Sequence, residues 1–267
     1  MSAAASTLLS VSFPICSQKE GRVPSFNFKV CSSLEPFQTG ARFLSDAELR
    51  RLRSLESFLY QRELPSGSLS VRVMRPNETD ATVVLLADSF AESMLLPSAY
   101  VKFLAFLVKQ YLLERRTLMP HTATLVAFYT TAYHDQQHTC LAGTVELCFD
   151  ARGSNASLPS PTPPRDMPYI SNMAVLKSLR RRGIGWHLLM ASEQLISQIT
   201  SSTHLYLHCR IIDHAPFNMY SKADYKIVKT DSLLVLLMLQ RRKHLMCKTL
   251  PLLTIPPPPT DLSLSDI

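Results

Sequence analysis

A basic, glycine-containing turn is the segment of this sequence best suited to binding an anion. Residues 180–185 read RRRGIG and lie between an apolar stretch that predicts a strand, 169–176, and a stretch with helical spacing, 184–200. Glycine lets the backbone approach a ligand closely, and the first N–H groups of a helix have no partner within the helix. The turn therefore predicts a pyrophosphate site at a helix N-terminus. It is neither a Walker A loop, since no Lys-Ser/Thr pair follows, nor a dinucleotide fingerprint, whose third glycine is replaced by Leu188.

Two segments together resemble a known family. Residues 169–186 read YISNMAVLKSLRRRGIGW, which resembles the strand and the R/Q-x-x-G-x-G/A turn of the GNAT superfamily of N-acetyltransferases. Residues 207–225 read LHCRIIDHAPFNMYSKADY, which is similar to the family's segment H-V-x-x-x-N-x-x-A-x-x-x-Y-x-x-x-G-F/Y. The resemblance covers residues 69–240. It implies an α/β GNAT fold, with a mixed central sheet of about seven strands splayed at an acetyl-CoA groove and helices on its flanks.

The resemblance also implies a co-substrate and the residues that hold it. In the family, the strand offers backbone groups to the pantetheine arm of acetyl-CoA and the turn holds the pyrophosphate, with no metal. Two departures stand out: Asp213 replaces the family's asparagine, and residues 223–225 read ADY in place of G-F/Y. The implied cofactor-binding residues are Met173, Ala174, Val175, Arg180, Arg181, Arg182, Gly183, Ile184, Gly185, Trp186, Asp213, His214, Ala215 and Tyr220.

Acetyl transfer to an amine needs a neutral amine, a polarised thioester carbonyl and a proton for the departing thiolate. Tyr220 is the candidate acid, because a phenol with a pKa of about 10 can protonate a thiolate with a pKa of about 8.5. His208 is the candidate base, since an imidazole with a pKa of about 6.5 is mostly neutral at working pH. Glu146, on the predicted strand 139–149, is the second candidate. A backbone N–H of residues 173–175 is expected to meet the oxyanion.

Structural explanations for the same residues stay open. Tyr220 shares helical spacing with Phe217 and Ala223, so all three could belong to the core. A single histidine on a strand, such as His208, is more often structural than catalytic.

Composition narrows the class of protein. The 267 residues carry 28 basic and 21 acidic side chains, for a net charge of +7, which favours anionic partners. No apolar run reaches the length of about 20 residues that a membrane-spanning helix needs. The six cysteines show no spacing typical of a zinc site or a disulfide framework.

The N-terminal segment differs from the rest of the chain. Residues 1–45 contain nine serines, and two acidic side chains against four basic ones. This acid-poor, serine-rich composition predicts an organelle transit peptide, of the plastid type because the start is small and uncharged. A tail without a targeting role is the alternative. The transit-like composition predicts the chloroplast stroma as the location, and the resemblance, which is greatest to plastid members of plants, implies the same.

The remaining chain divides into three parts. Residues 46–68 predict an amphipathic helix and a linker, with a capping box at Ser45 and leucines at helical spacing up to Leu59. Residues 69–250 form the expected N-acetyltransferase domain with a proline-rich insert at 150–168, and residues 251–267 form a proline-rich tail expected to stay extended. Within the domain we expect helices at 78–91, 98–114, 184–200 and 214–223, and strands near 71–75 and at 122–133, 139–149, 169–176, 203–211, 225–230 and 232–240.

Three functions fit these observations. The resemblance implies an acetyl-CoA-dependent N-acetyltransferase acting on protein N-termini and lysine side chains, as the plastid members do. A nucleic-acid-binding module could use the basic clusters 180–182 and 241–243, but only Trp186 supplies an aromatic side chain nearby, so nucleic acid is the less favoured partner. A GNAT-like module could also bind acyl-CoA as a regulatory ligand without chemistry. The sequence carries no signal for an oligomeric state.

Overall fold

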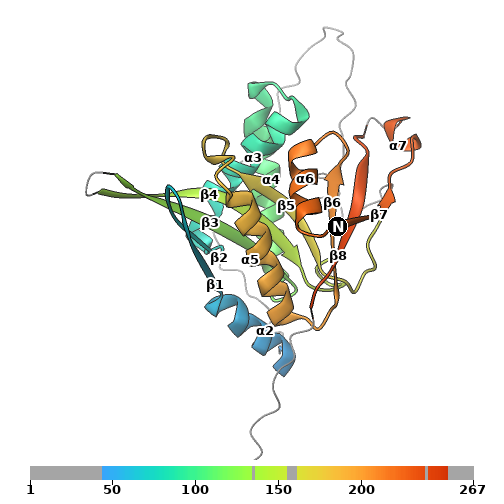
Figure 1. Ribbon diagram of the computed structural model, residues 1–267, viewed down its shortest axis with the longest axis horizontal. Coiled ribbons are helices and arrows are strands. Elements are labelled where there is room, and N and C mark those ends of the chain that lie inside the picture. The colour runs from blue at the N-terminus through green and yellow to red at the C-terminus, as the bar shows by residue number, and fades with distance from the viewer. Residues whose placement is uncertain (1–43, 134–135, 155–160, 238–239, 252–267) are drawn as a thin grey trace, which may run out of the picture.

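A single mixed sheet of eight strands organises the chain (Figure 1). The computed structural model describes residues 44–133, 136–154, 161–237 and 240–251, and strand order within them is β1-β2-β3-β4-β5-β6-β8-β7. All neighbouring strands are antiparallel except β5 and β6. The strands are β1 (Leu59–Leu64), β2 (Gly67–Val73), β3 (Thr122–Tyr133), β4 (Gln136–Cys148), β5 (Tyr169–Val175), β6 (His204–Arg210), β7 (Lys226–Thr230) and β8 (Lys243–Thr249).

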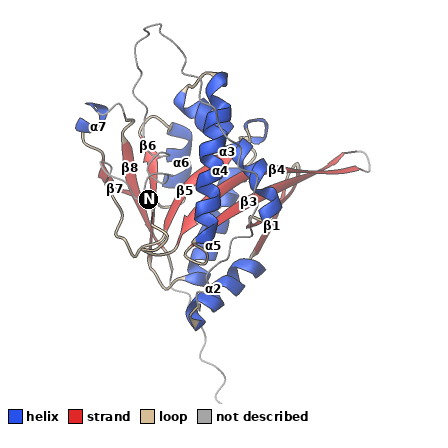
Figure 2. Cartoon of the chain, turned by 180° about the vertical axis from the view of Figure 1, so that it is seen from behind, coloured by secondary structure: helices blue, strands red, loops and turns tan. Residues whose placement is uncertain are grey.

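Helices cover both faces of the sheet, as Figures 1 and 2 show from opposite sides. Alternate residues of β4 identify the faces: Val145 packs in the core cluster that contains Leu188 of α5, whereas the Glu146 side chain contacts Tyr111 of α4. The helices are α2 (Asp46–Ser57), α3 (Thr79–Met94), α4 (Val101–Thr117), α5 (Ile184–Ile199), α6 (His214–Lys222) and α7 (Leu234–Leu237). None of them, within the described ranges, is long and apolar enough to cross a membrane.

The predicted elements of the central region are confirmed with small shifts at their ends. The strand expected at 122–133 is β3, and the helix expected at 184–200 is α5, which ends at Ile199. Both stretches have a strong period in the sequence, two for the strand and 3.6 for the helix, so local pattern and tertiary packing agree. A mixed sheet with helices on both faces agrees with the α/β class expected from the sequence.

The N-terminal helix is shorter than predicted. Its capping box is present, with Ser45 accepting from the backbone N–H of Glu48, but the helix ends at Ser57 and residues 59–64 form strand β1. β1 pairs along its whole length with β2, so backbone hydrogen bonds to a partner strand outweigh the leucine spacing that predicted a helix. The expected linker is therefore part of the sheet, which has eight strands instead of about seven, and a domain boundary at residue 69 would cut β2.

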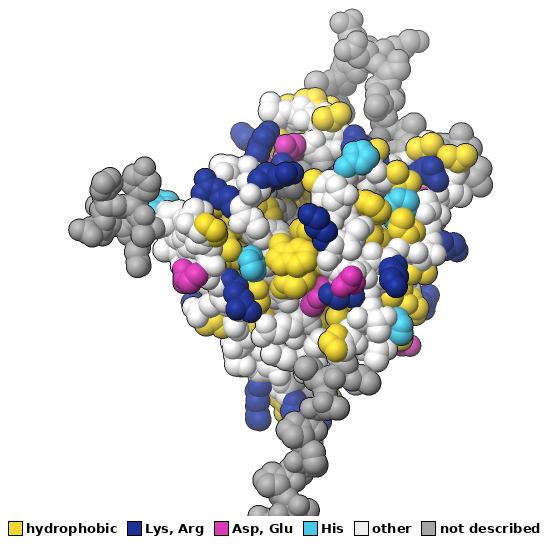
Figure 3. Space-filling model, in the orientation of Figure 1, with side chains coloured by type: hydrophobic (Ala, Val, Ile, Leu, Met, Phe, Trp, Pro, Cys, Tyr) yellow, Lys and Arg dark blue, Asp and Glu magenta, His cyan; other side chains and the backbone are white. Residues whose placement is uncertain are grey.

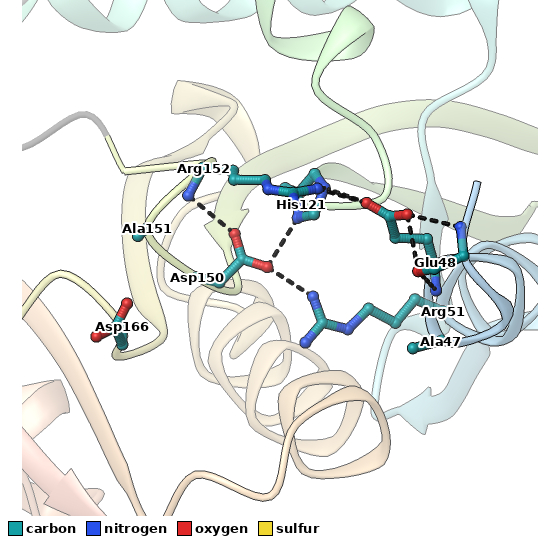
Figure 4. A pocket seen from close by; sticks show the side chains of 9 residues that line it. Ala47, Glu48, Arg51, His121, Asp150, Ala151, Arg152 and Asp166 are labelled. Carbon is teal, nitrogen blue, oxygen red and sulfur yellow. Dashed lines mark hydrogen bonds and ion pairs between the residues drawn. The ribbon is translucent and has the colours of Figure 1, made fainter. Parts of the chain in front are cut away.

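The α2 helix is tied to the far ends of β3 and β4 by charged side chains (Figure 4). Asp150 accepts from Arg51 at 2.6 Å and contacts His121 Nδ1 at 2.8 Å, while Glu48 pairs with Arg152 at 2.6 Å. Asp150 and Arg152 belong to the start of the proline-rich insert. The beginning of this insert is thus fixed to the domain, and residues 155–160 lie outside the described residues.

The strand predicted at 232–240 is wrong. Residues 234–237 form the short helix α7, and the last strand is β8, which lies between β6 and β7 and pairs with both. A run of leucines without alternation does not distinguish a strand from a helix.

The transit peptide predicted for 1–45 falls almost entirely outside the described residues, which begin at residue 44, and the proline-rich tail is described only at residue 251.

The turn between β1 and β2 gives a test of this hairpin. Gly67 has φ +150°, and a Cβ built on it would lie 2.2 Å from the carbonyl oxygen of Thr130. We expect Gly67→Ala to lower the free energy of unfolding by about 1 to 3 kcal/mol, because the backbone of β3 cannot give way as a flexible side chain would. Urea denaturation measures the change, with Ser68→Ala as the neighbouring control. Equal stability of the glycine variant and the wild type would mean that this turn does not pack against β3.

Candidate active site

The parallel strands β5 and β6 part soon after they begin, which opens the sheet. In the described chain they share two register pairs, Tyr169 with Tyr206 and Ile170 with Leu207, and diverge beyond them. Each strand leads into a helix on the same face, β5 into α5 and β6 into α6 (Figure 1). The splayed sheet expected from the sequence is therefore present, and the helix N-termini that follow the two strands lie near its opening.

The turn before α5 has the backbone geometry of an anion site. Gly183 is the N-cap residue with φ +83°, in the left-handed region that favours glycine. The first hydrogen bond of the helix runs from His187 N–H to the Gly183 carbonyl, so the N–H groups before it have no partner within the helix. A Cβ on Gly183 would come no closer than 3.9 Å to another residue, and one on Gly185 no closer than 3.5 Å. Space and donors for a phosphate therefore lie together.

The three arginines of the turn are exposed but differ in their contacts. Arg180 donates to the Val175 carbonyl at 3.1 Å and to Glu92 of α3 at 2.7 Å, so its guanidinium ties the turn to α3. Arg182 lies over the ring of Tyr129, at 6.0 Å from the ring centroid, and Arg181 has a left-handed backbone with φ +67°. Lys and Arg side chains gather over this part of the face that carries α5 (Figure 3). Arg181 and Arg182 are thus better placed than Arg180 to meet an incoming phosphate.

Tyr220 lies across the opening from β5. Its ring is buried in the core, 7% exposed, and its hydroxyl lies 4.0 Å from the sulfur of Met173 on β5. The structural and the catalytic explanations for Tyr220 are therefore compatible, since the ring packs while the hydroxyl points at the strand expected to bind the cofactor. Burial, with smaller contributions from Cys209 and Asp213, raises the pKa of Tyr220 above its ordinary value, so the phenol keeps its proton at working pH.

His208 is hydrogen-bonded through both ring nitrogens. Nε2 lies 2.7 Å from the carbonyl oxygen of Pro161, and Nδ1 lies 2.7 Å from the hydroxyl of Tyr169 on β5. A carbonyl can only accept, so Nε2 carries the hydrogen and the Tyr169 hydroxyl donates to Nδ1. Burial lowers the pKa of His208 to about 4, which keeps the ring neutral. The Tyr169 oxygen retains a lone pair with which it can accept a proton.

Sequence reasoning missed Tyr169. The residue opens its strand with ordinary β alternation, and nothing local distinguishes it from Tyr206. Its contact with His208 spans 39 positions and depends on the parallel register of β5 and β6. The contact of His208 with the Pro161 carbonyl, from the proline-rich insert, also has no signal in the local sequence.

Glu146, the second candidate base, lies in a buried polar cluster on the α4 face of the sheet. It is 2% exposed and pairs with Arg115 of α4, with 2.5 Å between Arg115 Nε and Glu146 Oε1. Tyr111 donates to the carboxylate at 2.6 Å, and the side-chain amide of Asn172 donates to it at 3.0 Å. Both carboxylate oxygens of Glu146 are thus engaged by neighbouring side chains, and its role as a base stays a prediction.

The start of α6 holds the remaining predicted cofactor residues. Asp213 is the N-cap residue, but its side chain makes no capping hydrogen bond to the helix, whose residues are all described, and instead accepts from Arg210 at 2.7 Å. His214 and Ala215 are exposed in the first turn of α6.

Trp186, in the first turn of α5, is partly buried against the core. Across the described ranges, no group of three or more metal-ligating side chains is close enough to hold a metal ion.

Comparison with known proteins decides the family. Residues 98–225 match the model of the Acetyltransferase (GNAT) family. The chain is 61% identical over 228 residues to the "GCN5-related N-acetyltransferase 5, chloroplastic" of Arabidopsis thaliana, which covers 83% of this chain and 71% of that protein. This chain belongs to the GNAT family. It is thus an N-acetyltransferase by family, and GNAT enzymes use acetyl-CoA.

Two further comparisons are more distant. Over 61 residues this GNAT protein is 34% identical to an "N-alpha-acetyltransferase" of Sulfurisphaera tokodaii, which covers 23% of this chain and 36% of that one. The crystal structure of an uncharacterized protein from Bacillus halodurans superposes with a TM-score of 0.50 at 12% identity, covering 72% of this chain and 90% of that chain. The second likeness concerns the fold alone.

The turn before α5 can be tested by filling it. We expect Gly183→Val to weaken acetyl-CoA binding about tenfold or more, because a β-branched residue at φ +83° strains the backbone by about 1 to 3 kcal/mol and turns the N–H donors away from the phosphate. Gly183→Asn should lose less, since asparagine tolerates the left-handed region. Calorimetric titration with acetyl-CoA measures both variants. Unchanged affinity in the valine variant would remove the pyrophosphate from this turn.

Proposed function

We propose that this GNAT protein transfers the acetyl group of acetyl-CoA to protein amines, both N-terminal α-amines and lysine ε-amines, by direct attack on the thioester with Tyr220 as general acid. The observation that carries the proposal is the position of the Tyr220 hydroxyl, 4.0 Å from Met173 across the opening between β5 and β6. The turn of residues 180–185 stands at the same opening, so one ligand can reach both. The pyrophosphate would lie on the turn and the pantetheine arm along residues 173–175.

The chain supplies a group for each need of the reaction. The amine nitrogen bonds to the thioester carbon, the carbon–sulfur bond breaks, and the departing thiolate takes the proton of Tyr220. A backbone N–H of residues 173–175 stabilises the negative charge on the carbonyl oxygen. The attacking nitrogen gives up a proton to the Tyr169 oxygen while Tyr169 passes its own to Nδ1 of His208. Holding thioester and amine together in the groove adds to the rate by proximity.

The weak basicity of this relay favours one kind of amine. Because the pKa of His208 is lowered to about 4, the ring cannot hold a proton taken from an ammonium group for long, and the acceptor has to arrive neutral. An α-amine has a pKa of about 8 and a lysine of about 10.4, so near pH 8 about half of the first and under about 1% of the second are neutral. We therefore place N-terminal α-amines first and lysines second. The name of the Sulfurisphaera tokodaii relative, an N-alpha-acetyltransferase, agrees with this order.

The proposal extends to the location of the protein. The serine-rich, acid-poor composition of residues 1–45 is that of a plastid transit peptide. The Arabidopsis relative is named chloroplastic. The acceptors of the present protein would then be the N-termini and lysines of stromal proteins.

Tyr220→Phe tests the proton donor. We expect kcat to fall about 100-fold or more with little change in KM for acetyl-CoA, because the ring that packs is kept and the proton for the thiolate is lost. Initial rates of CoA release with a peptide amine measure the effect. The control is Tyr100→Phe, since Tyr100 is 57% exposed and lies in the short connection Ser98–Tyr100 before α4. Turnover that persists unchanged in Tyr220→Phe would remove this tyrosine from the chemistry.

The acceptor can be read by mass spectrometry. A mixture of peptides with free N-termini and matched peptides with blocked N-termini and one lysine is incubated with acetyl-CoA, and the added acetyl group is located. We expect free α-amines to react faster, and kcat/KM to rise with pH toward an apparent pKa of about 8. No inflection near 6.5 is expected, because the lowered pKa of His208 keeps its ring neutral from pH 6 to 9.

Other outcomes of the same experiment contradict parts of the proposal. Faster reaction of the lysine peptides reverses the order of acceptors, and an acid limb near pH 6.5 that is lost in His208→Asn assigns the rate to an ordinary histidine base. Binding of acetyl-CoA without turnover of any amine favours a regulatory acyl-CoA module. Salt-sensitive binding of RNA or DNA that is tighter than binding of acetyl-CoA favours the nucleic-acid module.

A further inference from the structure

Strand β5 contains an irregularity at the place where the cofactor would lie. Ser171 pairs with Glu146 and Ala174 with Thr144, so that Asn172 and Met173 together stand opposite one residue of β4. This two-against-one arrangement is a β-bulge. Asn172 occupies its first position with φ +47°, a left-handed conformation that glycine usually takes in bulges of this kind. Asparagine tolerates this conformation better than most other residues, and contacts to its side chain can hold it there.

The side chain of Asn172 is fixed by a buried polar cluster. Its amide nitrogen donates to Glu146 Oε2 at 3.0 Å and to the Tyr111 hydroxyl at 3.2 Å. The carboxylate is held in turn by Arg115 at 2.5 Å and by Tyr111 at 2.6 Å. The exposed fractions of Tyr111, Arg115 and Glu146 are 1%, 4% and 2%. We call these four residues, Tyr111, Arg115, Glu146 and Asn172, the bulge cluster.

Stability is a weak reason for such a cluster. Bringing a carboxylate and a guanidinium out of water costs several kcal/mol for each ion, and an apolar replacement of similar volume is often as stable. What the cluster does locally is hold Asn172 from the α4 face while the backbone of β5 turns out of register with β4. The residue that follows is Met173, whose sulfur meets the Tyr220 hydroxyl on the other side of the opening.

We propose that the bulge cluster is a positioning device for the thioester: Tyr111, Arg115 and Glu146 lock Asn172 in its left-handed conformation, and this aims a backbone N–H of residues 173–175 at the carbonyl oxygen of acetyl-CoA. The inference rests on the proposed function and deepens it. It gives Glu146 a role through Asn172 in place of proton abstraction. The pyrophosphate turn, formed by residues 180–185, lies outside the cluster, so the cluster acts on the carbonyl and leaves cofactor anchoring alone.

Asn172 variants test the proposal. Asn172→Ala loses the anchoring amide and strains the backbone at φ +47°, whereas Asn172→Gly loses the amide but tolerates the conformation. We expect kcat to fall about 10- to 100-fold in Asn172→Ala and less in Asn172→Gly, as for the loss or misplacement of an oxyanion donor. KM for acetyl-CoA should change by less than about threefold in both variants, because the pyrophosphate contacts are kept. Asn77, exposed in the turn before α3, gives matched controls as Asn77→Ala and Asn77→Gly.

A spectroscopic readout separates positioning from general damage to the fold. Infrared difference spectra of acetyl-CoA labelled with carbon-13 at the carbonyl report the hydrogen bond to its oxygen in the bound state. We expect the carbonyl band to shift to lower frequency on binding to the wild type and to Asn77→Ala, and to shift less on binding to Asn172→Ala. Tyr111→Phe, which removes one hydroxyl of the bulge cluster and leaves the backbone untouched, should move the band in the same direction by a smaller amount.

The outcomes distinguish this inference from the proposed function. Wild-type kcat and an unchanged carbonyl band in Asn172→Ala would overturn the inference and leave the acetyltransferase standing. Loss of kcat in proportion to lost thermal stability, with no change of the band, would also overturn it by giving the cluster a structural role. Failure of the wild type to bind acetyl-CoA would overturn the proposed function, and this inference with it.

Discussion

The separation of two parallel strands is the constraint on which the site depends. β5 and β6 are joined at Tyr169 and Ile170 and have no pairing beyond them in the described chain, so the inner edges of both strands present backbone groups that the sheet does not satisfy. Buried backbone N–H and C=O groups need partners, and a bound amide-containing chain such as pantetheine can supply them. The same separation lets Met173 and Tyr220 face each other across the gap. The expected cofactor site and the candidate proton donor thus depend on one feature of the sheet.

The two faces of the sheet carry different kinds of side chains. On the α5 face, Val145 and Leu147 of β4 pack in the large apolar core, which fixes the helix whose first turn carries the expected phosphate site. On the α4 face, Glu146 lies in a polar cluster, and His208 meets Tyr169. The period of two in a strand places neighbouring residues on opposite faces. One strand can therefore support an apolar core on one face and a buried polar cluster on the other.

The proline-rich insert is more than a spacer between β4 and β5. Its beginning, at Asp150 and Arg152, is tied to α2 and His121, and Pro161, further along the insert, presents its carbonyl to Nε2 of His208. That contact selects the tautomer of the ring, and the tautomer determines that Nδ1 is the nitrogen that accepts from Tyr169. The insert thereby determines which ring nitrogen of His208 faces Tyr169.

Local pattern predicted most elements and failed where pairing partners decide. Residues 122–133 and 184–200 have strong periods that no tertiary contact contradicts, and they were placed correctly. The helical spacing of leucines continues up to Leu59, but residues 59–64 pair along their whole length with β2. The leucine-rich run at 232–240 fits either state, and the strand that pairs with both β6 and β7 is β8, at Lys243–Thr249.

The sequence by itself determined the expected phosphate turn and the candidate acid. The glycines and arginines of 180–185 act through backbone conformation and charge over a few residues, and Tyr220 stands at a fixed spacing from Asp213 within one helix. Only the tertiary structure decided the contacts of His208 and Glu146. Tyr169, Pro161 and Arg115 come from distant parts of the chain, and their approach depends on strand register and on which face a helix covers. A one-residue change of register would turn each side chain to the opposite face, so these contacts exist only once the whole sheet has formed.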